Sequence, residues 1–149
     1  QKAHPYETVA FEIFSLDNPN PEVGMGKIGT LEKPMEPTAF LSFVKDRLHT
    51  ELIRHSPPIA KKIKRVAVLG GSGSFAIENA KLEGADAFIT ADLKYHQFYS
   101  GEENLLLVDV GHYESEQFTK NLIFDFLSKK MPNFAIVLSS TKTNPVNYY

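Results

Sequence analysis

The sequence predicts an α/β fold in which a mainly parallel sheet is flanked by helices. Short apolar runs with the composition of strands alternate with segments of helical spacing over most of the chain, as in sheets of this class. One run, residues 105–110, is apolar almost throughout, which is typical of a strand buried on both faces. Before residue 37 the composition differs. Pro34 and Pro37 place a boundary there, because proline fits neither a helix interior nor a strand ladder.

Residues 1–36 are expected to contain two strands. In residues 9–16, the apolar side chains of Val9, Phe11 and Ile13 alternate at period two and would share one face of a strand. A proline-containing loop follows, and a second strand is expected over residues 27–31. Because the chain has no initiator Met and the strand pattern begins almost at once, we expect a fragment or a processed form of a longer protein.

Residues 37–149 are expected to form four strands with helices between them. The strands are expected over residues 65–69, 87–90, 105–110 and 134–138, and the helices over residues 38–52, 75–82, 95–99 and 115–130. Thr38 is expected to cap the first helix, and Gly84 to follow the end of the second. The last helix should bury its apolar stripe, which consists of Phe118, Leu122, Ile123, Phe126 and Leu127.

Composition excludes several classes of protein. With 16 Lys and Arg against 18 Asp and Glu, the formal net charge is −2, which disfavours general nucleic-acid binding. The absence of Cys excludes a disulfide scaffold and every thiolate metal site. No apolar run approaches the ~20 residues needed to span a bilayer, and the start does not read as a signal peptide. We therefore expect no membrane partner and a cytoplasmic location.

The loop at residues 111–116 carries the strongest chemical signal. Ligands of open parallel sheets bind beyond the carboxyl ends of the strands, and this loop follows such a strand. His112 and Glu116 are four residues apart and would share one face of a helix. Imidazole and carboxylate are the usual ligands of zinc, manganese or iron, so the two residues are candidate metal ligands. A solvated helix start explains the same spacing.

The loop that follows residues 87–90 carries Asp92 and His96, which are candidate ligands or acid–base groups. A surface turn explains Asp92 and His96 equally well.

The glycine-rich loop at residues 70–74 is a third candidate site. Gly71, Gly73 and Ala76 fit the dinucleotide fingerprint between a strand and a helix. This makes Gly71, Ser72 and Gly73 candidate phosphate contacts. A tight glycine turn that packs a strand against a helix explains the loop as well.

Four stretches of the chain together resemble the NGG-interacting-factor-three-like family, whose members are often named GTP cyclohydrolase 1 type 2 homologs. They are residues 66–74 (VAVLGGSGS), 84–96 (GADAFITADLKYH), 108–116 (VDVGHYESE) and 143–146 (TNPV). Residues 4–7 (HPYE) and 24–29 (GMGKIG) resemble the end of a domain inserted in the longer members. The stretches run through most of the chain, and their joint match is specific.

The resemblance implies a metal centre. Members of this family hold a pair of divalent metal ions with His and carboxylate ligands, and by position His112 and Glu116 would be two of these ligands. Asp92 and His96 would lie nearby, supporting the ligands or contacting substrate. The other ligands, two adjacent His and an Asp, belong to the N-terminal half of the family, and this sequence has no His-His pair. Zinc, manganese, iron, cobalt and nickel all suit such ligands.

The resemblance also implies an architecture. Residues 1–36 would be the C-terminal segment of an inserted α+β domain, similar to the PII signalling and copper-tolerance folds. Residues 37–149 would be the C-terminal α/β half of the metal-binding domain. Members of the family form ring-like homohexamers, so a homo-oligomer is expected.

The function implied is that of a dinuclear-metal-binding protein of hydrolase type that acts on a nucleotide or a phosphoester. Two neighbouring ions would share a water molecule and lower its pKa. Two alternatives belong to other classes. One is a scaffold or regulatory protein that the metals stabilise and that turns nothing over. The other is a nucleotide-binding module that uses residues 71–76 without metal.

Overall fold

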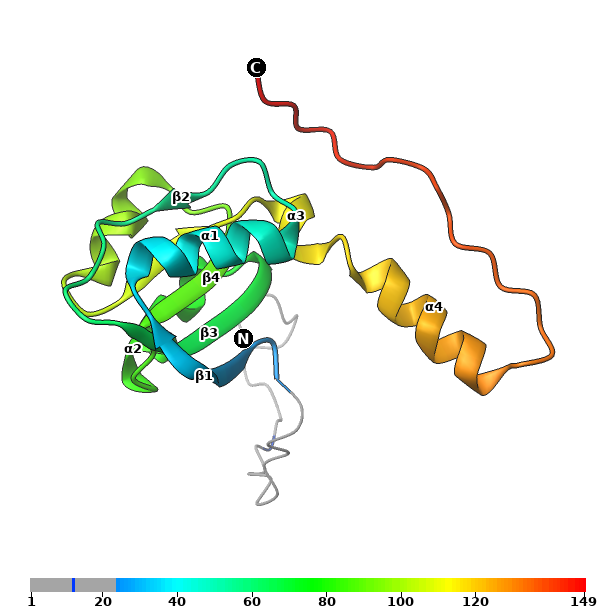
Figure 1. Cartoon of the computed structure of the whole chain (residues 1–149), viewed down its shortest axis with the longest axis horizontal. Coiled ribbons are helices and arrows are strands. Elements are labelled where there is room, and N and C mark those ends of the chain that lie inside the picture. The colour runs from blue at the N-terminus through cyan, green and yellow to red at the C-terminus, as the bar shows by residue number, and fades with distance from the viewer. Residues whose placement is uncertain (1–11, 13–23) are drawn as a thin grey trace.

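A computed structural model describes residue 12 and residues 24–149 of the chain. These residues form a five-stranded sheet with the strand order β1-β3-β4-β5-β2 (Figure 1). The strands are β1 (Lys27–Met35), β2 (Arg54–His55), β3 (Ile63–Ser72), β4 (Ala87–Ala91) and β5 (Leu106–Asp109). The helices are α1 (Pro37–Leu48), α2 (Ile77–Leu82), α3 (His112–Glu116) and α4 (Thr119–Lys130), with 3-10 helices over Ser74–Ala76 and Tyr95–Gly101.

The predicted α/β class is confirmed, but the sheet is parallel only at its centre. Strands β3, β4 and β5 are parallel neighbours and correspond to three of the four predicted strands. The two edge strands run the other way, because β1 pairs antiparallel with β3 and β2 pairs antiparallel with β5. Strand β2 was not predicted, since two residues are too few to show a period.

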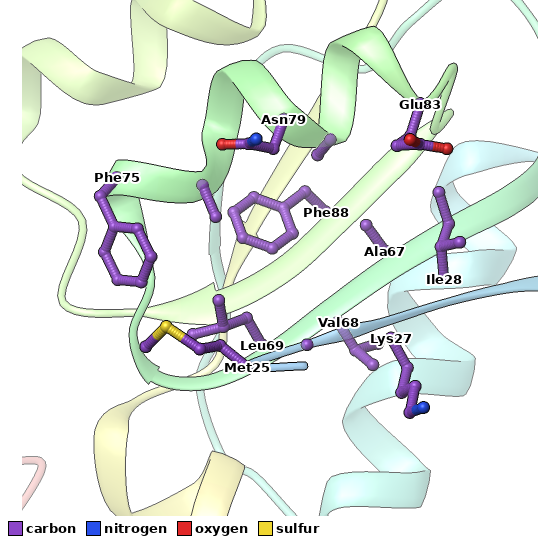
Figure 2. A pocket seen from close by; sticks show the side chains of 13 residues that line it. Met25, Lys27, Ile28, Ala67, Val68, Leu69, Phe75, Asn79, Glu83 and Phe88 are labelled. Atoms are coloured by element: carbon purple, nitrogen blue, oxygen red, sulfur yellow. The ribbon is translucent and has the colours of Figure 1, made fainter. Parts of the chain in front are cut away.

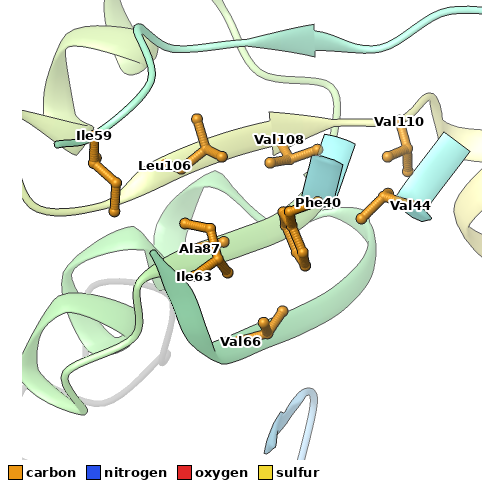
Figure 3. Packing of buried hydrophobic residues seen from close by; sticks show 9 residues of the cluster. All are labelled: Phe40, Val44, Ile59, Ile63, Val66, Ala87, Leu106, Val108 and Val110. Atoms are coloured by element: carbon orange, nitrogen blue, oxygen red, sulfur yellow. The ribbon is translucent and has the colours of Figure 1, made fainter. Parts of the chain in front are cut away.

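Helices cover both faces of the sheet, and an apolar cluster fills each interface. One cluster joins α1 to the sheet, with Phe40 and Val44 of the helix packed against side chains from β3, β4 and β5 (Figure 3). The other cluster joins α2 to the opposite face, where Ile77 and Ala80 pack near Phe88. Side chains alternate between the two faces along β5, so the neighbouring residues Leu106 and Leu107 belong to different clusters.

The boundary expected at residues 33–37 does not interrupt β1. The strand continues through Pro34 to Met35, and its register with β3 shifts between Thr30 and Met35. Pro34 is tolerated because β1 is an edge strand whose pairing with β3 is irregular at this point. Proline lacks a backbone N–H, and in an edge strand this does not break the hydrogen bonding of a central strand. The division between residues 36 and 37 stays a prediction, and most of the strand expected at residues 9–16 lies outside the described residues.

Helix α1 differs from its prediction at both ends. Glu36 rather than Thr38 is the N-cap residue, and Pro37 occupies the first turn, where a missing N–H costs nothing. The helix ends at Leu48, because His49 adopts a left-handed conformation with φ of 50°. Leu52 therefore lies beyond the helix and is 49% exposed.

The end of the chain departs furthest from prediction. The single helix expected over residues 115–130 is two helices, α3 and α4, and α4 has no buried residue. Figure 1 shows α4 projecting away from the sheet. Residues 134–138 form no strand, and Phe134 is 69% exposed. The prediction that this helix buries its apolar stripe is wrong, because Leu122, Ile123 and Phe126 are all more than half exposed. No helix in the described part of the chain is long and apolar enough to cross a membrane.

Candidate metal centre

The parallel strands β3, β4 and β5 end on the same side of the sheet, so the loops that follow them lie together, as the sequence predicts. His112, after β5, lies between two carboxylates. Its Nδ1 is 2.6 Å from Oδ2 of Asp92, which follows β4, and its Nε2 is 3.4 Å from Oε2 of Glu116. The imidazole thus faces one carboxylate with each nitrogen. All three side chains are about half exposed, so they are open to solvent and to a ligand.

The glycines at the end of β3 let α3 approach the sheet. A Cβ atom at Gly71 would lie 2.6 Å from Oε1 of Glu116 and 3.4 Å from Nε2 of His112. The backbone N–H of Gly71 donates a hydrogen bond to Oγ of Ser115, at 2.8 Å. Its carbonyl accepts one from the Thr90 hydroxyl, at 3.1 Å. Gly71 therefore serves the packing of α3 against β3.

The charge of Asp92 changes the titration of its neighbour. The hydrogen bond to Asp92 raises the pKa of His112 above its ordinary value, and the negative charges of Asp92 and Glu116 raise it further. Partial burial of the ring acts in the opposite direction and does not prevail. When the ring is neutral, a bond from Nδ1–H to Asp92 leaves the lone pair on Nε2, which faces Glu116.

The donors present fit a divalent ion in kind and in spacing. Two donors that each lie about 2.0–2.2 Å from one zinc ion in tetrahedral geometry are separated by roughly 3.3–3.6 Å. The 3.4 Å between Nε2 of His112 and Oε2 of Glu116 agrees with that spacing. Asp92 bonds the Nδ1 of His112, as carboxylates do that orient histidine ligands in metal sites. Within the described residues, no group of three or more His, Asp or Glu is arranged to hold an ion, so these donors alone would not complete a metal site.

The other predicted site residues have no hydrogen bond or ion pair to this group in the described structure, apart from Gly71, which contacts it closely. His96 is exposed on the 3-10 helix Tyr95–Gly101, and its ring contacts Tyr95 at 5.3 Å between centroids. Ser72 is exposed and Gly73 is buried against Thr90. Phosphate contact by Gly71, Ser72 and Gly73 stays a prediction. It gains no support from Gly71, whose N–H is already bonded and which faces a carboxylate.

Sequence reasoning missed an ion pair that supports the site. Asp109, the last residue of β5, is 3% exposed and pairs with the guanidinium of Arg54 on β2. The Asp109 carboxylate also accepts hydrogen bonds from the backbone N–H groups of Leu93 (2.9 Å) and Gly111 (3.1 Å). These bonds fix the two loops that carry Asp92 and His112. An Asp in a buried strand was a visible signal, whereas nothing in the sequence pointed to Arg54 as its partner.

A cleft of about 450 Å³ adjoins His112. Arg54, Asp92, Asp109 and Glu114 line it together with residues from the C-terminal segment. Those residues are Thr143, Asn144, Pro145, Val146 and Tyr148. The cleft thus combines His112, one of the two candidate ligands, with polar groups from other parts of the chain, whereas Glu116 does not line it.

A second hollow is apolar and contains none of the predicted site residues. This groove of about 380 Å³ lies between α2 and the β1–β3 edge of the sheet. Figure 2 shows Phe75, Leu69 and Met25 among the side chains that line it. It offers no constellation of ionisable groups comparable to that around His112.

The fold and the group at the carboxyl edge of the sheet define an α/β protein with a candidate metal-ligand pair. Residues 2–145 match the family Duf34/NIF3 (NGG1p interacting factor 3). The chain belongs to this family, which confirms the resemblance found in the sequence.

Individual relatives agree with this membership. A Bacillus subtilis protein named GTP cyclohydrolase 1 type 2 homolog is 38% identical over 152 residues, covering 99% of this chain and 40% of the relative. A crystal structure of a Bacillus cereus protein related to NIF3 has a TM-score of 0.80 at 35% identity, covering 99% of this chain and 42% of that one. Staphylococcus aureus protein SA1388 has a TM-score of 0.73 at 28% identity, covering 85% and 37%. The chain thus spans about 40% of the length of the relatives that it matches.

Proposed function

We propose that His112 and Glu116 are two ligands of a divalent-metal centre in a protein of hydrolase type. The observation that carries the proposal is the pair of donors, Nε2 of His112 and Oε2 of Glu116, which are 3.4 Å apart at the ligand-binding edge of the sheet. Neither donor is buried, so an ion can reach both from solvent.

The proposed centre holds two ions, which are zinc, manganese, iron, cobalt or nickel. When bound, such a pair would supply a water molecule with a lowered pKa, which gives hydroxide near neutral pH. Two ligands are too few for this centre. The remaining ligands would come from polypeptide outside residues 24–149, consistent with a chain that spans about 40% of its relatives.

The chain's own residues would prepare the site. Asp92 accepts the Nδ1 proton of His112 and so presents Nε2 as the ligand atom. Asp109 holds the loops before and after β5 through Leu93 and Gly111. Ser115, bonded to Gly71, fixes the first turn of α3, on which both ligands stand.

The proposed substrate is a nucleotide or a phosphoester. The name of the relatives, GTP cyclohydrolase 1 type 2 homolog, supports a nucleotide. A homohexamer in the cytoplasm is part of the same proposal and rests on the family resemblance. A metal-independent nucleotide module receives less support, because the N–H of Gly71 is already bonded to Ser115.

The test is the metal content of the purified chain, measured by elemental analysis. The double variant His112→Ala, Glu116→Ala should lose the bound metal. The variant His96→Ala is the matched control, because His96 contacts Tyr95 and does not line the cleft beside His112, and it should keep the metal. Bound metal at the same content in all three proteins would remove His112 and Glu116 from the centre. A metal-free full-length form would overturn the proposal.

A further inference from the structure

Tyr148 and its neighbours in the C-terminal segment close one side of the cleft beside His112. Asn144 donates a hydrogen bond from Nδ2 to Oε1 of Glu114, at 3.1 Å. The side-chain oxygen of Asn144 accepts a bond from the N–H of Val146, also at 3.1 Å, which bends the segment locally. Glu114 is only 8% exposed, so this contact anchors the segment to a buried point of α3.

Arg54 is held in place on the cleft wall and keeps donors available. Its Nη2 contacts both Asp109 and the carbonyl oxygen of Leu93. Its Cζ lies 5.5 Å from the centre of the Phe98 ring. Throughout residues 24–149, no hydrogen bond uses Nη1 or Nε of Arg54, although a guanidinium has five N–H donors. The Arg54 side chain is 53% exposed and lines the cleft.

Tyr148 brings a second donor to the same cleft. It is 46% exposed, and its hydroxyl lies near the backbone of Gly111, 3.5 Å from where a Cβ atom on that residue would stand. No group in the described part of the chain hydrogen-bonds the phenol. Burial raises the pKa of Tyr148, and the negative charges of Glu114 and Asp109 raise it further, so the hydroxyl keeps its proton.

Charge decides what these donors can bind. Asp92, Asp109 and Glu114 line the cleft, and Arg54 is the only lysine or arginine among its lining residues in the described structure. An anion entering the cleft alone would therefore meet a surplus of negative charge. A divalent ion at His112 and Glu116 would offset much of that negative charge, so anion binding and metal binding should reinforce each other.

We propose that Arg54 and Tyr148 bind the phosphate oxygens of a phosphoester in this cleft, and that the Glu114–Asn144 hydrogen bond holds Tyr148 in position for it. The coupling to metal rests on the proposed function above. The phosphate-binding role of Arg54 and Tyr148 rests only on the position of their side chains in the cleft. Arg54 and Tyr148 would fix the orientation of the ligand, while Asn144 is a positioning residue.

The test uses methyl phosphate as the probe and isothermal titration calorimetry on the 149-residue chain with and without manganese. The variant Tyr148→Phe removes only the hydroxyl, and the neighbouring Tyr149→Phe is the matched control, because Tyr149 does not line the cleft. We expect Tyr148→Phe to weaken binding of methyl phosphate by roughly two- to tenfold, the range for one hydrogen bond. Tyr149→Phe should bind as the unaltered chain does.

The variant Asn144→Ala tests the anchor separately. It should weaken methyl phosphate binding and speed amide hydrogen exchange over residues 143–148, with no change in metal content. Equal affinity of the unaltered chain, Tyr148→Phe and Tyr149→Phe would overturn the inference while the metal proposal stood. Loss of metal from Tyr148→Phe would overturn it too, because the phenol would then serve the metal.

If no metal binds to the 149-residue chain, the metal-free titration decides on the donor pair, and the proposed function is decided separately on the full-length form. Binding of methyl phosphate that Tyr148→Phe weakens would support the pair without the metal. No binding at all would overturn it.

Discussion

Gly71 and Glu116 lie so close together that a side chain on the first would occupy the space of the second. A Cβ atom at Gly71 would stand 2.6 Å from Oε1 of Glu116, well inside van der Waals contact. Gly71 also has φ of +66°, a conformation that residues with a Cβ rarely adopt. The glycine-rich end of β3 therefore determines where the proposed ligand on α3 can sit.

Gly71→Ala should weaken metal binding as well as stability. Its Cβ must displace Glu116, which we propose as a ligand. The control Gly84→Ala has the same backbone strain, with φ of +67°, and nothing within 4 Å of the added Cβ. Both variants should cost about 1–2 kcal/mol from strain. The difference is expected in metal binding, because only the Cβ of Gly71→Ala displaces the half-exposed carboxylate of Glu116. Urea unfolding and elemental analysis provide the two readouts. Identical behaviour of the two variants would show that the close approach has no consequence.

The titration of His112 should depend on Asp92 more than on Glu116. The hydrogen bond to Asp92 is the largest cause of the raised pKa of His112. A raised folded-state pKa means that the protonated ring stabilises the fold. This contribution is complete below the unfolded value near 6.5 and is lost as pH rises through the raised value.

An NMR titration of the His112 ring measures this effect in the metal-free chain. Asp92→Asn should lower the pKa of His112 by more than Glu116→Gln does. Metal binding should weaken as pH falls through the same range, because a protonated imidazole cannot be a ligand. A pKa of His112 that does not respond to Asp92→Asn would contradict the contact seen at 2.6 Å.

Asp109 should matter for the folding of the site as much as for its charge. Asp109→Asn keeps the shape but weakens the pairing with Arg54 and the bonds from Leu93 and Gly111. We expect a loss of about 1.5–3 kcal/mol in the free energy of unfolding, the range for hydrogen bonds to a charged group. Asp125→Asn, on exposed α4, should change it little. Equal stability of the two variants in urea would be inconsistent with Asp109 as the link between the loops.

The sequence was informative where a single segment carries the signal. The apolar runs of β3, β4 and β5 predict buried central strands. Since parallel strands end at one edge, they also predict that Asp92 and His112 come close. The spacing of His112 and Glu116 predicts that both stand on one helix face, as they do on α3.

Contacts between segments that are far apart in the sequence could not be predicted. Arg54 reaches Asp109 across 55 positions from a strand of two residues, and no local pattern encodes that pairing. Asn144 likewise reaches Glu114 from a segment without regular structure. The stripe on α4 shows the same limit, because periodicity indicates which side of a helix is apolar and not what covers it.

The exposed stripe of α4 leads to the last prediction. Leu122 is 71% exposed and Phe126 is 58% exposed, so the double variant Leu122→Ser, Phe126→Ser should change the free energy of unfolding little, within about 0.5 kcal/mol per site. The control Phe40→Ala truncates a core side chain that is 1% exposed and should cost about 3–5 kcal/mol. Chemical denaturation at two protein concentrations is the measurement. A large loss that grows with concentration would mean that α4 is covered by another copy of the chain. A large loss independent of concentration would mean that α4 folds back onto its own sheet, contrary to the structure.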